Sequence, residues 1–169
     1  MLIVAVGHSE DIDAKDAAQQ LINQCSTGLN GHSPQAGILF CAVDFDYETI
    51  LAEINKAFPG IELIGCTTDG EISSAQGFLE DSITLTLFYS DTIEIKAGCG
   101  KNLSANIKVA VADAIKMAQQ KLSKEARFCM ITPESLTANG VAVLEAVKQQ
   151  TGINFPVFGG LAGDQWQME

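Results

Sequence analysis

Two glycine-bounded loops carry the residues that could bind or transform a small molecule. The first lies in the run I-G-C-T-T-D-G-E, and its candidate binding residues are Gly65, Cys66, Thr67, Thr68 and Glu71. The second is F-G-G-L-A-G-D-Q, from Phe158 to Gln165, and its candidates are Gly159, Gly160, Gly163 and Asp164. Because glycine lets the backbone approach a ligand closely, the two loops together predict a binding site.

The groups in these loops suit a zwitterion such as a free amino acid. Backbone N–H groups and the hydroxyls of Thr67 and Thr68 can donate hydrogen bonds to a carboxylate, and Glu71 and Asp164 can accept them from an amine. A carboxylate in a turn also often caps its own backbone, which is the alternative role for Asp69 and Asp164.

A thiol in the first loop raises a second possibility, a cysteine-dependent hydrolase with Cys66 as nucleophile. Such a thiol needs a neighbouring base or an environment that lowers its pKa. The chain has two histidines, His8 and His32, and His8 follows a strand, so it can reach the same end of the sheet. No third residue that would orient the base is identifiable, and Cys66 can equally be a small residue that fits between glycines.

Haem is a third possibility, with His8, His32 or a cysteine as iron ligand. The C-x-x-C-H motif of covalent haem attachment is absent from the sequence. His8 therefore stands as a candidate in these three hypotheses, and a role in protein interaction alone is a fourth possibility.

Hydrophobic patterns in the first half predict alternating strands and helices. Strands are expected at 2–6 and 37–43, and a third begins at Ile61 and stops at Gly65. The first helix is expected behind Ser9, Asp11 and Asp13 as capping candidates, and the second behind Asp44 or Asp46. A further strand at 82–88 follows after about ten residues, too few for a crossover helix, so we expect it to pair antiparallel with the strand before it.

The second half repeats this order. It predicts strands at 93–97, 128–132 and 155–158 and helices at 104–122 and 136–149. Equivalent landmarks are separated by a similar distance: Gly7 to Gly98 is 91 residues, Ile38 to Phe128 is 90, and Gly65 to Gly159 is 94. A steady register indicates duplication, although ordinary βαβ alternation also repeats.

We therefore expect an α/β fold, with two similar βαβαβ units forming a mixed, largely parallel sheet with flanking helices. The first repeat is expected at 1–90 and the second at 91–169 of one domain. A counterpart of the strand at 82–88 would fall near residue 176, so the second repeat is expected to be truncated.

Composition narrows the class of protein. An apolar content of 47% and a mean hydropathy of +0.17 predict a globular core. The apolar runs are too short to span a membrane, and no signal peptide is evident, so we expect a cytoplasmic protein. Five cysteines without a C-x-x-C pair fit a reducing compartment.

The charge is concentrated in the first half. Residues 1–90 hold thirteen acidic residues and two lysines, whereas residues 91–169 hold eight of each sign. Nucleic acid binding requires a basic stripe to neutralise phosphates, and the sequence has none. We interpret the acidic half as a contribution to solubility.

Seven motifs in order resemble the FIST family, and specifically its N-terminal domain. The motifs are G-H-S at 7–9, G-I-L-F-C at 37–41, D-F-D-Y at 44–47, F-P-G at 58–60, I-G-C-T-T-D-G-E at 64–71, G-F-L-E-D-S-I at 77–83 and F-G-G-L-A-G-D at 158–164. They extend over nearly the whole chain, and the two glycine-rich motifs together are the specific part of the resemblance.

The resemblance implies a bacterial sensory domain of signal transduction and not an enzyme. It implies a small-molecule ligand, with amino acids proposed for the family, and some similar proteins are haem-binding nitric oxide sensors. It also implies a C-terminal partner domain or a separate signalling partner, such as a kinase, a chemotaxis receptor or a cyclic-dinucleotide enzyme.

Overall fold

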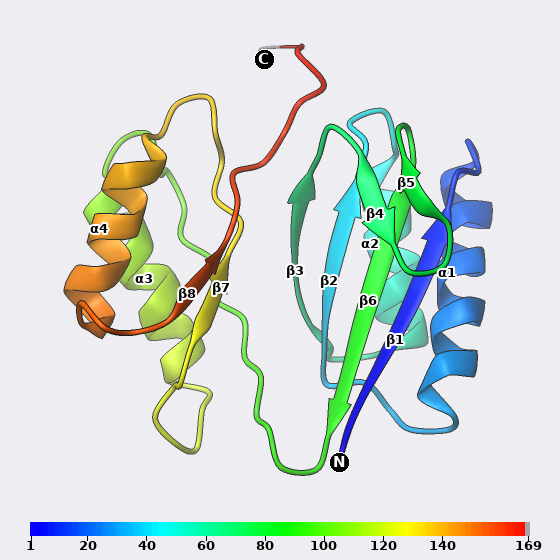
Figure 1. The fold of residues 1–169 in the computed structure, drawn as a ribbon, viewed down its shortest axis with the longest axis horizontal. Helices are drawn as coiled ribbons and strands as arrows, with labels where there is room; N and C mark the ends of the chain where they lie inside the picture. The colour runs from blue at the N-terminus through cyan, green and yellow to red at the C-terminus, as the bar shows by residue number, and fades with distance from the viewer. Residues whose placement is uncertain (168–169) are drawn as a thin grey trace. The chain divides into compact units, whose positions relative to one another are not determined.

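The computed structural model describes residues 1–167 and divides into two compact units (Figure 1). Unit 1 contains Met1–Ile93 together with the C-terminal segment that starts at Gly163. Unit 2 contains residues 94–162. None of the helices in the described part of the chain is long and apolar enough to cross a membrane.

Unit 1 is built on a mixed four-stranded sheet, which confirms the predicted α/β class. The strands are β1 (Leu2–Ser9), β2 (Ala36–Cys41), β3 (Glu62–Thr67) and β6 (Ile83–Ser90). Their order is β1-β6-β2-β3, with β2 and β3 parallel and β6 antiparallel to both of its neighbours. Three of the four strands therefore run in the same direction.

The position of β6 corrects one prediction. The short connection from β3 suggested that the two strands are neighbours, but β6 lies between β1 and β2. Its residues Ile83, Leu85 and Leu87 are fully buried. A central place in the sheet explains why its alternating pattern is so strongly apolar on one face.

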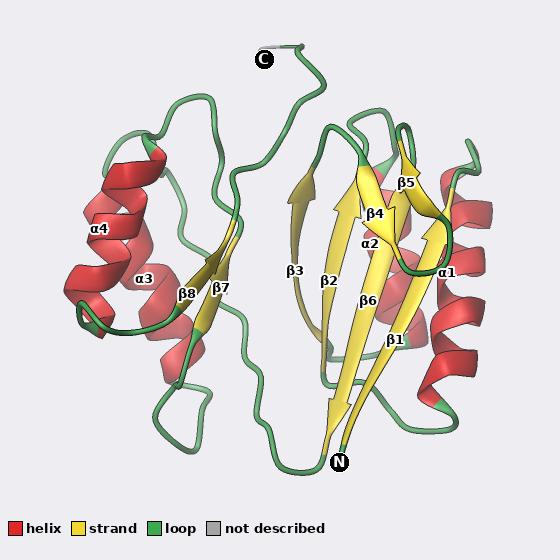
Figure 2. Cartoon of the chain, viewed as in Figure 1, coloured by secondary structure: helices red, strands yellow, loops and turns green. Residues whose placement is uncertain are grey.

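Two helices cover one face of this sheet (Figure 2). Helix α1 (Ala14–Leu29) begins at Asp13, whose carboxylate accepts hydrogen bonds from the next backbone N–H groups, and α2 (Tyr47–Ala57) is capped in the same way by Asp46. Asp13 was one of three predicted candidates for the first cap, and Asp46 was one of two for the second. The apolar stripes of the helices, including Leu21 and Ile54, complete the core.

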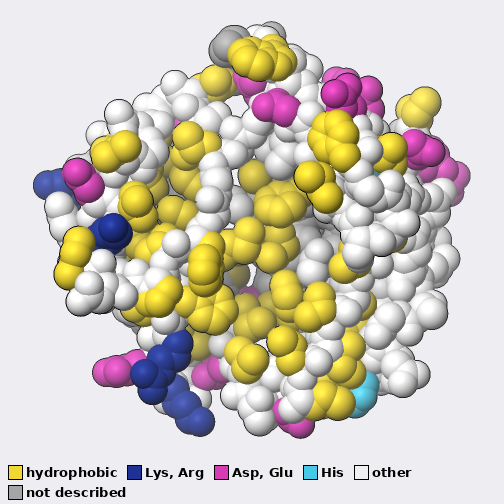
Figure 3. All heavy atoms as spheres, in the orientation of Figure 1, with side chains coloured by type: hydrophobic (Ala, Val, Ile, Leu, Met, Phe, Trp, Pro, Cys, Tyr) yellow, Lys and Arg dark blue, Asp and Glu magenta, His cyan; other side chains and the backbone are white. Residues whose placement is uncertain are grey.

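The other face of the sheet carries hydrophobic side chains as well (Figure 3). Among them are Leu2 and Val4 on β1, which are 51% and 48% exposed.

A small hairpin, which the sequence did not predict, lies next to this sheet. It consists of β4 (Glu71–Ser73) and β5 (Gly77–Leu79). The predicted loop from Gly65 to Glu71 is correspondingly shorter, because β3 continues to Thr67 and Glu71 starts the hairpin. Strands of three residues are too short to show a clear alternation, which is why the pattern missed them.

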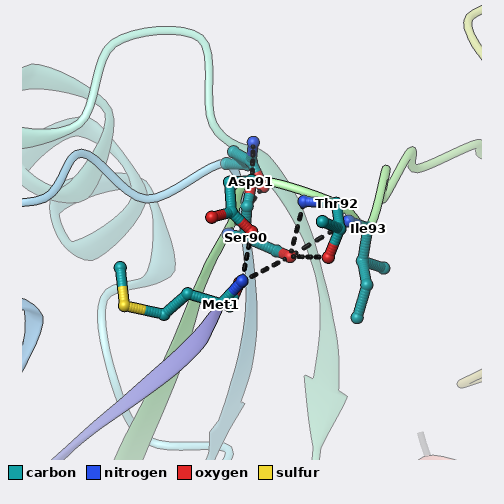
Figure 4. A network of polar contacts seen from close by, with 6 residues as sticks. Met1, Ser90, Asp91, Thr92 and Ile93 are labelled. Carbon is teal, nitrogen blue, oxygen red and sulfur yellow. Dashed lines mark hydrogen bonds and ion pairs between the residues drawn. The ribbon is translucent and has the colours of Figure 1, made fainter.

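Ser90, at the end of β6, holds the chain that follows this strand (Figure 4). The Ser90 hydroxyl donates to the carbonyl of Met1 at 2.9 Å and accepts from the N–H groups of Thr92 and Ile93 at 3.2 and 3.0 Å. The terminal ammonium of Met1 binds the carboxylate of Asp91. These bonds tie the start of the chain to the residues at the end of β6 and just after it.

Unit 2 has two helices and a pair of parallel strands. They are α3 (Ile107–Gln119), β7 (Cys129–Ile131), α4 (Gly140–Thr151) and β8 (Val157–Gly159). Val111, Val143 and Val147 are buried in its own hydrophobic cluster. Both helices start at asparagine caps, Asn106 and Asn139.

The strand predicted at 93–97 does not form. Two polar groups of this segment bond to residues that follow α3: the Lys121 ammonium donates to the Ala97 carbonyl at 3.1 Å, and the Glu94 carboxylate accepts from the Ser123 backbone N–H at 2.8 Å. The segment therefore has the composition of a strand without the strand ladder.

Each unit contains the same kind of close backbone contact within its own pair of parallel strands. Gly65 in β3 faces Leu39 in β2, and Gly159 in β8 faces Ile131 in β7. A Cβ atom at either glycine would lie 1.9 Å from the carbonyl oxygen of its partner. Both glycines are therefore explained by the close approach of the neighbouring strand.

Replacing the core residue Leu85 tests the packing of unit 1. Leu85→Ala should lower the free energy of unfolding by about 2–5 kcal/mol, because it leaves a cavity among fully buried side chains. Chemical denaturation measures this change. The control is Ile12→Ala at a side chain that is 96% exposed, and equal effects of the two variants would contradict the described core.

Candidate functional site

The register of unit 1 brings the carboxyl ends of three strands to one edge. Ser9 of β1 and Cys41 of β2 both face Ile83 of β6, and Cys41 also faces Thr67 of β3. These four residues form one row across the sheet. In α/β sheets the crevice outside the carboxyl ends of the strands is the usual place for a ligand.

Backbone hydrogen bonds hold the loops that leave this edge. The N–H of Ala42 donates to the carbonyl of Ser82 at 3.0 Å, and the N–H of Thr68 donates to the carbonyl of Cys41 at 3.0 Å. The loops after β2 and β3 thus start from fixed positions.

The C-terminal segment of unit 1, Gly163 to Gln167, lies against these loops. The N–H of Gly163 donates to the Thr67 carbonyl at 2.8 Å, and the N–H of Gln165 donates to the Asp69 carboxylate at 2.6 Å. A Cβ atom on Gly163 would be 2.8 Å from that carboxylate. A glycine at 163 therefore lets the segment approach Asp69.

The side chain of Gln165 makes two further bonds in this edge, in opposite directions. Its Oε1 accepts from the N–H of Val43 at 3.1 Å, and its Nε2 donates to the Asp81 carboxylate at 2.8 Å. The sequence placed Gln165 at the end of the second glycine loop but gave it no role. Only the fold brings Val43, Asp69 and Asp81 to one residue.

The Glu71 carboxylate is buried and bonded within the chain. One of its oxygens accepts from the Thr68 hydroxyl, and the other accepts from the backbone N–H and the hydroxyl of Ser82. The residue predicted to receive a ligand amine thus joins β4 to the start of β6. Thr68 is engaged in the same network.

His8 extends this network beneath the hairpin. Its ring is fully buried, with Nδ1 2.7 Å from the Ser73 hydroxyl and Nε2 2.9 Å from the Ser82 hydroxyl. Because the Ser82 hydroxyl donates to Glu71, it accepts from Nε2–H, and the neutral imidazole accepts at Nδ1 from Ser73. Every polar atom of the ring has a partner.

Burial sets the protonation of His8. Desolvation lowers the pKa of its imidazole below the ordinary value of 6.5, and the nearby charges of Glu71 and Glu10 oppose that shift. A neutral imidazole fits the hydrogen bonds described above.

The remaining candidates are divided between the units. Cys66 lies in β3 opposite Phe40 and is half-buried. Asp164 belongs to unit 1, and its carboxylate accepts from the Trp166 N–H at 3.2 Å. Gly159 and Gly160 belong to unit 2. The structure therefore groups Thr67, Thr68, Gly163 and Asp164 in one unit.

The environment of Cys66 does not favour a nucleophilic thiol. Burial raises the pKa of Cys66, whereas a catalytic cysteine needs a lowered one. His8, the proposed base, has both ring nitrogens bonded to serines.

The hydrogen bonds of His8 to Ser73 and Ser82 also argue against His8 as a haem ligand. An axial ligand must direct a free ring nitrogen at the iron, and neither nitrogen of the buried His8 ring is available for that. The ring of His32 stacks on Tyr89 at 4.3 Å between centroids. The His8 site therefore does not fit a haem ligand.

Two cavities lie away from the carboxyl edge. One of about 380 Å³ in unit 2 is lined by the start of α3 and by α4, and one of about 250 Å³ in unit 1 lies between α2 and β3. Neither cavity is lined by Gln165 or by the residues that it contacts. The side chain of Gln165 itself occupies the space between Val43 and Asp81.

A family model, the FIST N domain, matches residues 35–169. The chain belongs to the FIST family. FIST domains are sensory domains of signal-transduction proteins, so the resemblance seen in the motifs is confirmed. No curated protein matched the chain.

Two solved structures are distantly similar. An FtsZ dimer from M. jannaschii is 15% identical with a TM-score of 0.31, over 52% of this chain and 26% of that one. A cyanuric acid hydrolase is 14% identical with a TM-score of 0.39, over 89% of this chain and 49% of that one. The chain thus spans less than half the length of each.

Stability should depend on pH through His8. The native state holds the imidazole neutral, so unfolded chains bind more protons as the pH falls below 6.5. The contribution of neutral His8 to the free energy of unfolding is fully present above pH 6.5. It is lost as the pH falls through the lowered pKa of His8 in the folded state. Urea denaturation from pH 7.5 to 5 should show this loss, and His8→Gln should reduce it. His32→Gln is the control, and an unchanged pH dependence in His8→Gln would contradict the described burial.

Thiol labelling tests the hydrolase alternative. Cys66 should react with iodoacetamide more slowly than the exposed Cys99 at pH 7–8, because burial raises the pKa of Cys66. Mass spectrometry of the labelled peptides gives both rates in one sample. Faster labelling of Cys66 than of Cys99 at neutral pH would contradict this expectation and support Cys66 as a nucleophile.

Proposed function

We propose that this FIST domain binds an amino acid at the carboxyl edge of unit 1 and acts as a sensor and not as an enzyme. The proposal rests on three bonds of Gln165. Its side-chain oxygen accepts from the Val43 N–H, its side-chain nitrogen donates to the Asp81 carboxylate, and its backbone N–H donates to the Asp69 carboxylate. A backbone N–H donor and two carboxylate acceptors thus meet at the edge where α/β sheets usually bind ligands.

Asp69 replaces Glu71 as the proposed acceptor for the ligand amine. Glu71 is 2% exposed and engaged by Thr68 and Ser82, whereas Asp69 is exposed in the loop after β3. Gly65, Cys66, Thr67, Gly163 and Asp164 remain in the proposal as the backbone that forms this edge. His8 and Glu71 support the loop from below through Ser82.

The two other hypotheses have less support. The hydrolase lacks a base for Cys66, because His8 is bonded to Ser73 and Ser82, and haem lacks a free ligand nitrogen on His8. A non-catalytic role also agrees with the sensory function of the FIST family.

We propose a signalling partner for this domain because FIST domains belong to signal-transduction proteins. A C-terminal partner domain, or a separate kinase, chemotaxis receptor or cyclic-dinucleotide enzyme, would read the bound state. We keep the cytoplasm of a bacterium as the proposed location, which agrees with five free cysteines.

We also propose that the two units are repeats. The glycine contacts at β2–β3 and β7–β8 are the same, and they lie 92 residues apart at Leu39 and Ile131 and 94 apart at Gly65 and Gly159. In both units the glycine approaches the same atom of its partner, the carbonyl oxygen. This shared detail supports duplication more strongly than the order of helices and strands does.

A thermal-shift screen of the twenty amino acids tests the function. A ligand that binds only the folded chain should raise Tm with concentration, by the equivalent of about 2.7 kcal/mol at a hundred times Kd. Asp69→Asn should remove most of the shift, because the ligand amine loses its carboxylate partner. Asp113→Asn, at an exposed site on α3, should leave the shift unchanged.

Two outcomes would contradict the proposal. One is a flat response to the whole panel. The other is a response that Asp69→Asn does not weaken relative to Asp113→Asn.

A further inference from the structure

We propose that Gln165 is an intramolecular occupant of a carboxamide site, and that a free amino acid with a side-chain amide, such as L-glutamine, displaces it. This inference rests on the proposed function and specifies both the ligand and its competitor. It concerns three partners of one residue: the Val43 N–H, the Asp69 carboxylate and the Asp81 carboxylate.

The two side-chain bonds distinguish an amide from an acid. A carboxamide has an oxygen that accepts and a nitrogen that donates. The edge offers a donor at Val43, 3.1 Å from Oε1, and an acceptor at Asp81, 2.8 Å from Nε2. A carboxylate in the same place would set one of its oxygens against the Asp81 carboxylate, where the two negative charges repel. The site therefore selects glutamine over glutamate.

The third bond gives the position of the amine. The backbone N–H of Gln165 donates to Asp69 at 2.6 Å. A free α-ammonium at this place would make a charge-assisted bond, which is stronger than the bond from a neutral amide. Because all three bonds come from one glutamine residue, their spacing already matches the amine and the side-chain amide of free glutamine.

The segment that carries Gln165 is suited to release. Gln165 and Trp166 have φ angles of 50° and 65°, a left-handed conformation that costs energy in residues other than glycine. The Trp166 side chain is 80% exposed, so undocking it uncovers little hydrophobic surface. An occupant of this kind weakens the binding of a free ligand, because the apparent Kd equals the intrinsic Kd divided by the fraction of time that the site is open.

Trp166 provides the readout because it is the single tryptophan of the chain. Titration of the 169-residue protein with L-glutamine should change its fluorescence as the segment leaves the edge. L-glutamate at the same concentrations should change it much less.

The variant Gln165→Ala tests the competition by calorimetric titration. It should bind L-glutamine about tenfold more tightly than the wild type, because the site is no longer filled from within. Gln167→Ala is the matched control, an exposed glutamine two residues away, and it should bind like the wild type. Adding Asp81→Ala to Gln165→Ala should abolish the preference for glutamine over glutamate.

A second variant covers the case in which Gln165→Ala does not fold. Gln165→Glu keeps the size of the side chain and sets a carboxylate against Asp81, so it should release the segment and also tighten glutamine binding.

The outcomes separate this inference from the proposed function. If other amino acids bind through Asp69 while glutamine has no advantage over glutamate, the carboxamide site is wrong and the sensor stands. Equal glutamine affinity in Gln165→Ala, Gln165→Glu and the wild type would overturn the competition. If no amino acid binds to any of these proteins, both proposals fail.

Discussion

The insertion of β6 between β1 and β2 is the constraint on which the rest of unit 1 depends. Because β6 is antiparallel to both neighbours, β1 and β2 run in the same direction, and their last residues Ser9 and Cys41 meet the same residue, Ile83. The loops after the strands are thereby delivered to one edge. Without this register, Asp69 and Asp81 would not reach the same glutamine.

A buried polar chain supports that edge. His8 on β1, Ser82 before β6 and Glu71 on β4 bond in sequence, and all three are at most 2% exposed. Buried polar groups stabilise one arrangement when each has a partner, and removing one member leaves the others unsatisfied. The residues that looked most like binding or catalytic groups therefore act as the foundation of the site, while its surface is formed by Asp69, Asp81 and backbone N–H groups.

Much of the architecture was predictable because local signals agreed with the fold. The caps at Asp13 and Asp46 and the apolar stripes behind them depend on neighbours in sequence, so the patterns predicted both helices. The prediction of a strand at 93–97 was wrong because a strand needs a neighbouring strand to pair with, which a local pattern does not contain; in the structure the Ala97 carbonyl accepts from Lys121. The role of Gln165 depends on partners 84 to 122 residues away, which no local pattern contains.

Hydrogen–deuterium exchange with and without L-glutamine tests most directly whether the carboxyl edge of unit 1 is the ligand site. We predict that the ligand speeds exchange in the segment at 163–167, because the N–H bonds of Gly163 and Gln165 are broken, and leaves the N–H groups in the loops at 42–46 and 67–70 protected, because it takes over the bond from Val43. Equal exchange of all three segments in both conditions, with glutamine bound elsewhere in the chain, would contradict this prediction.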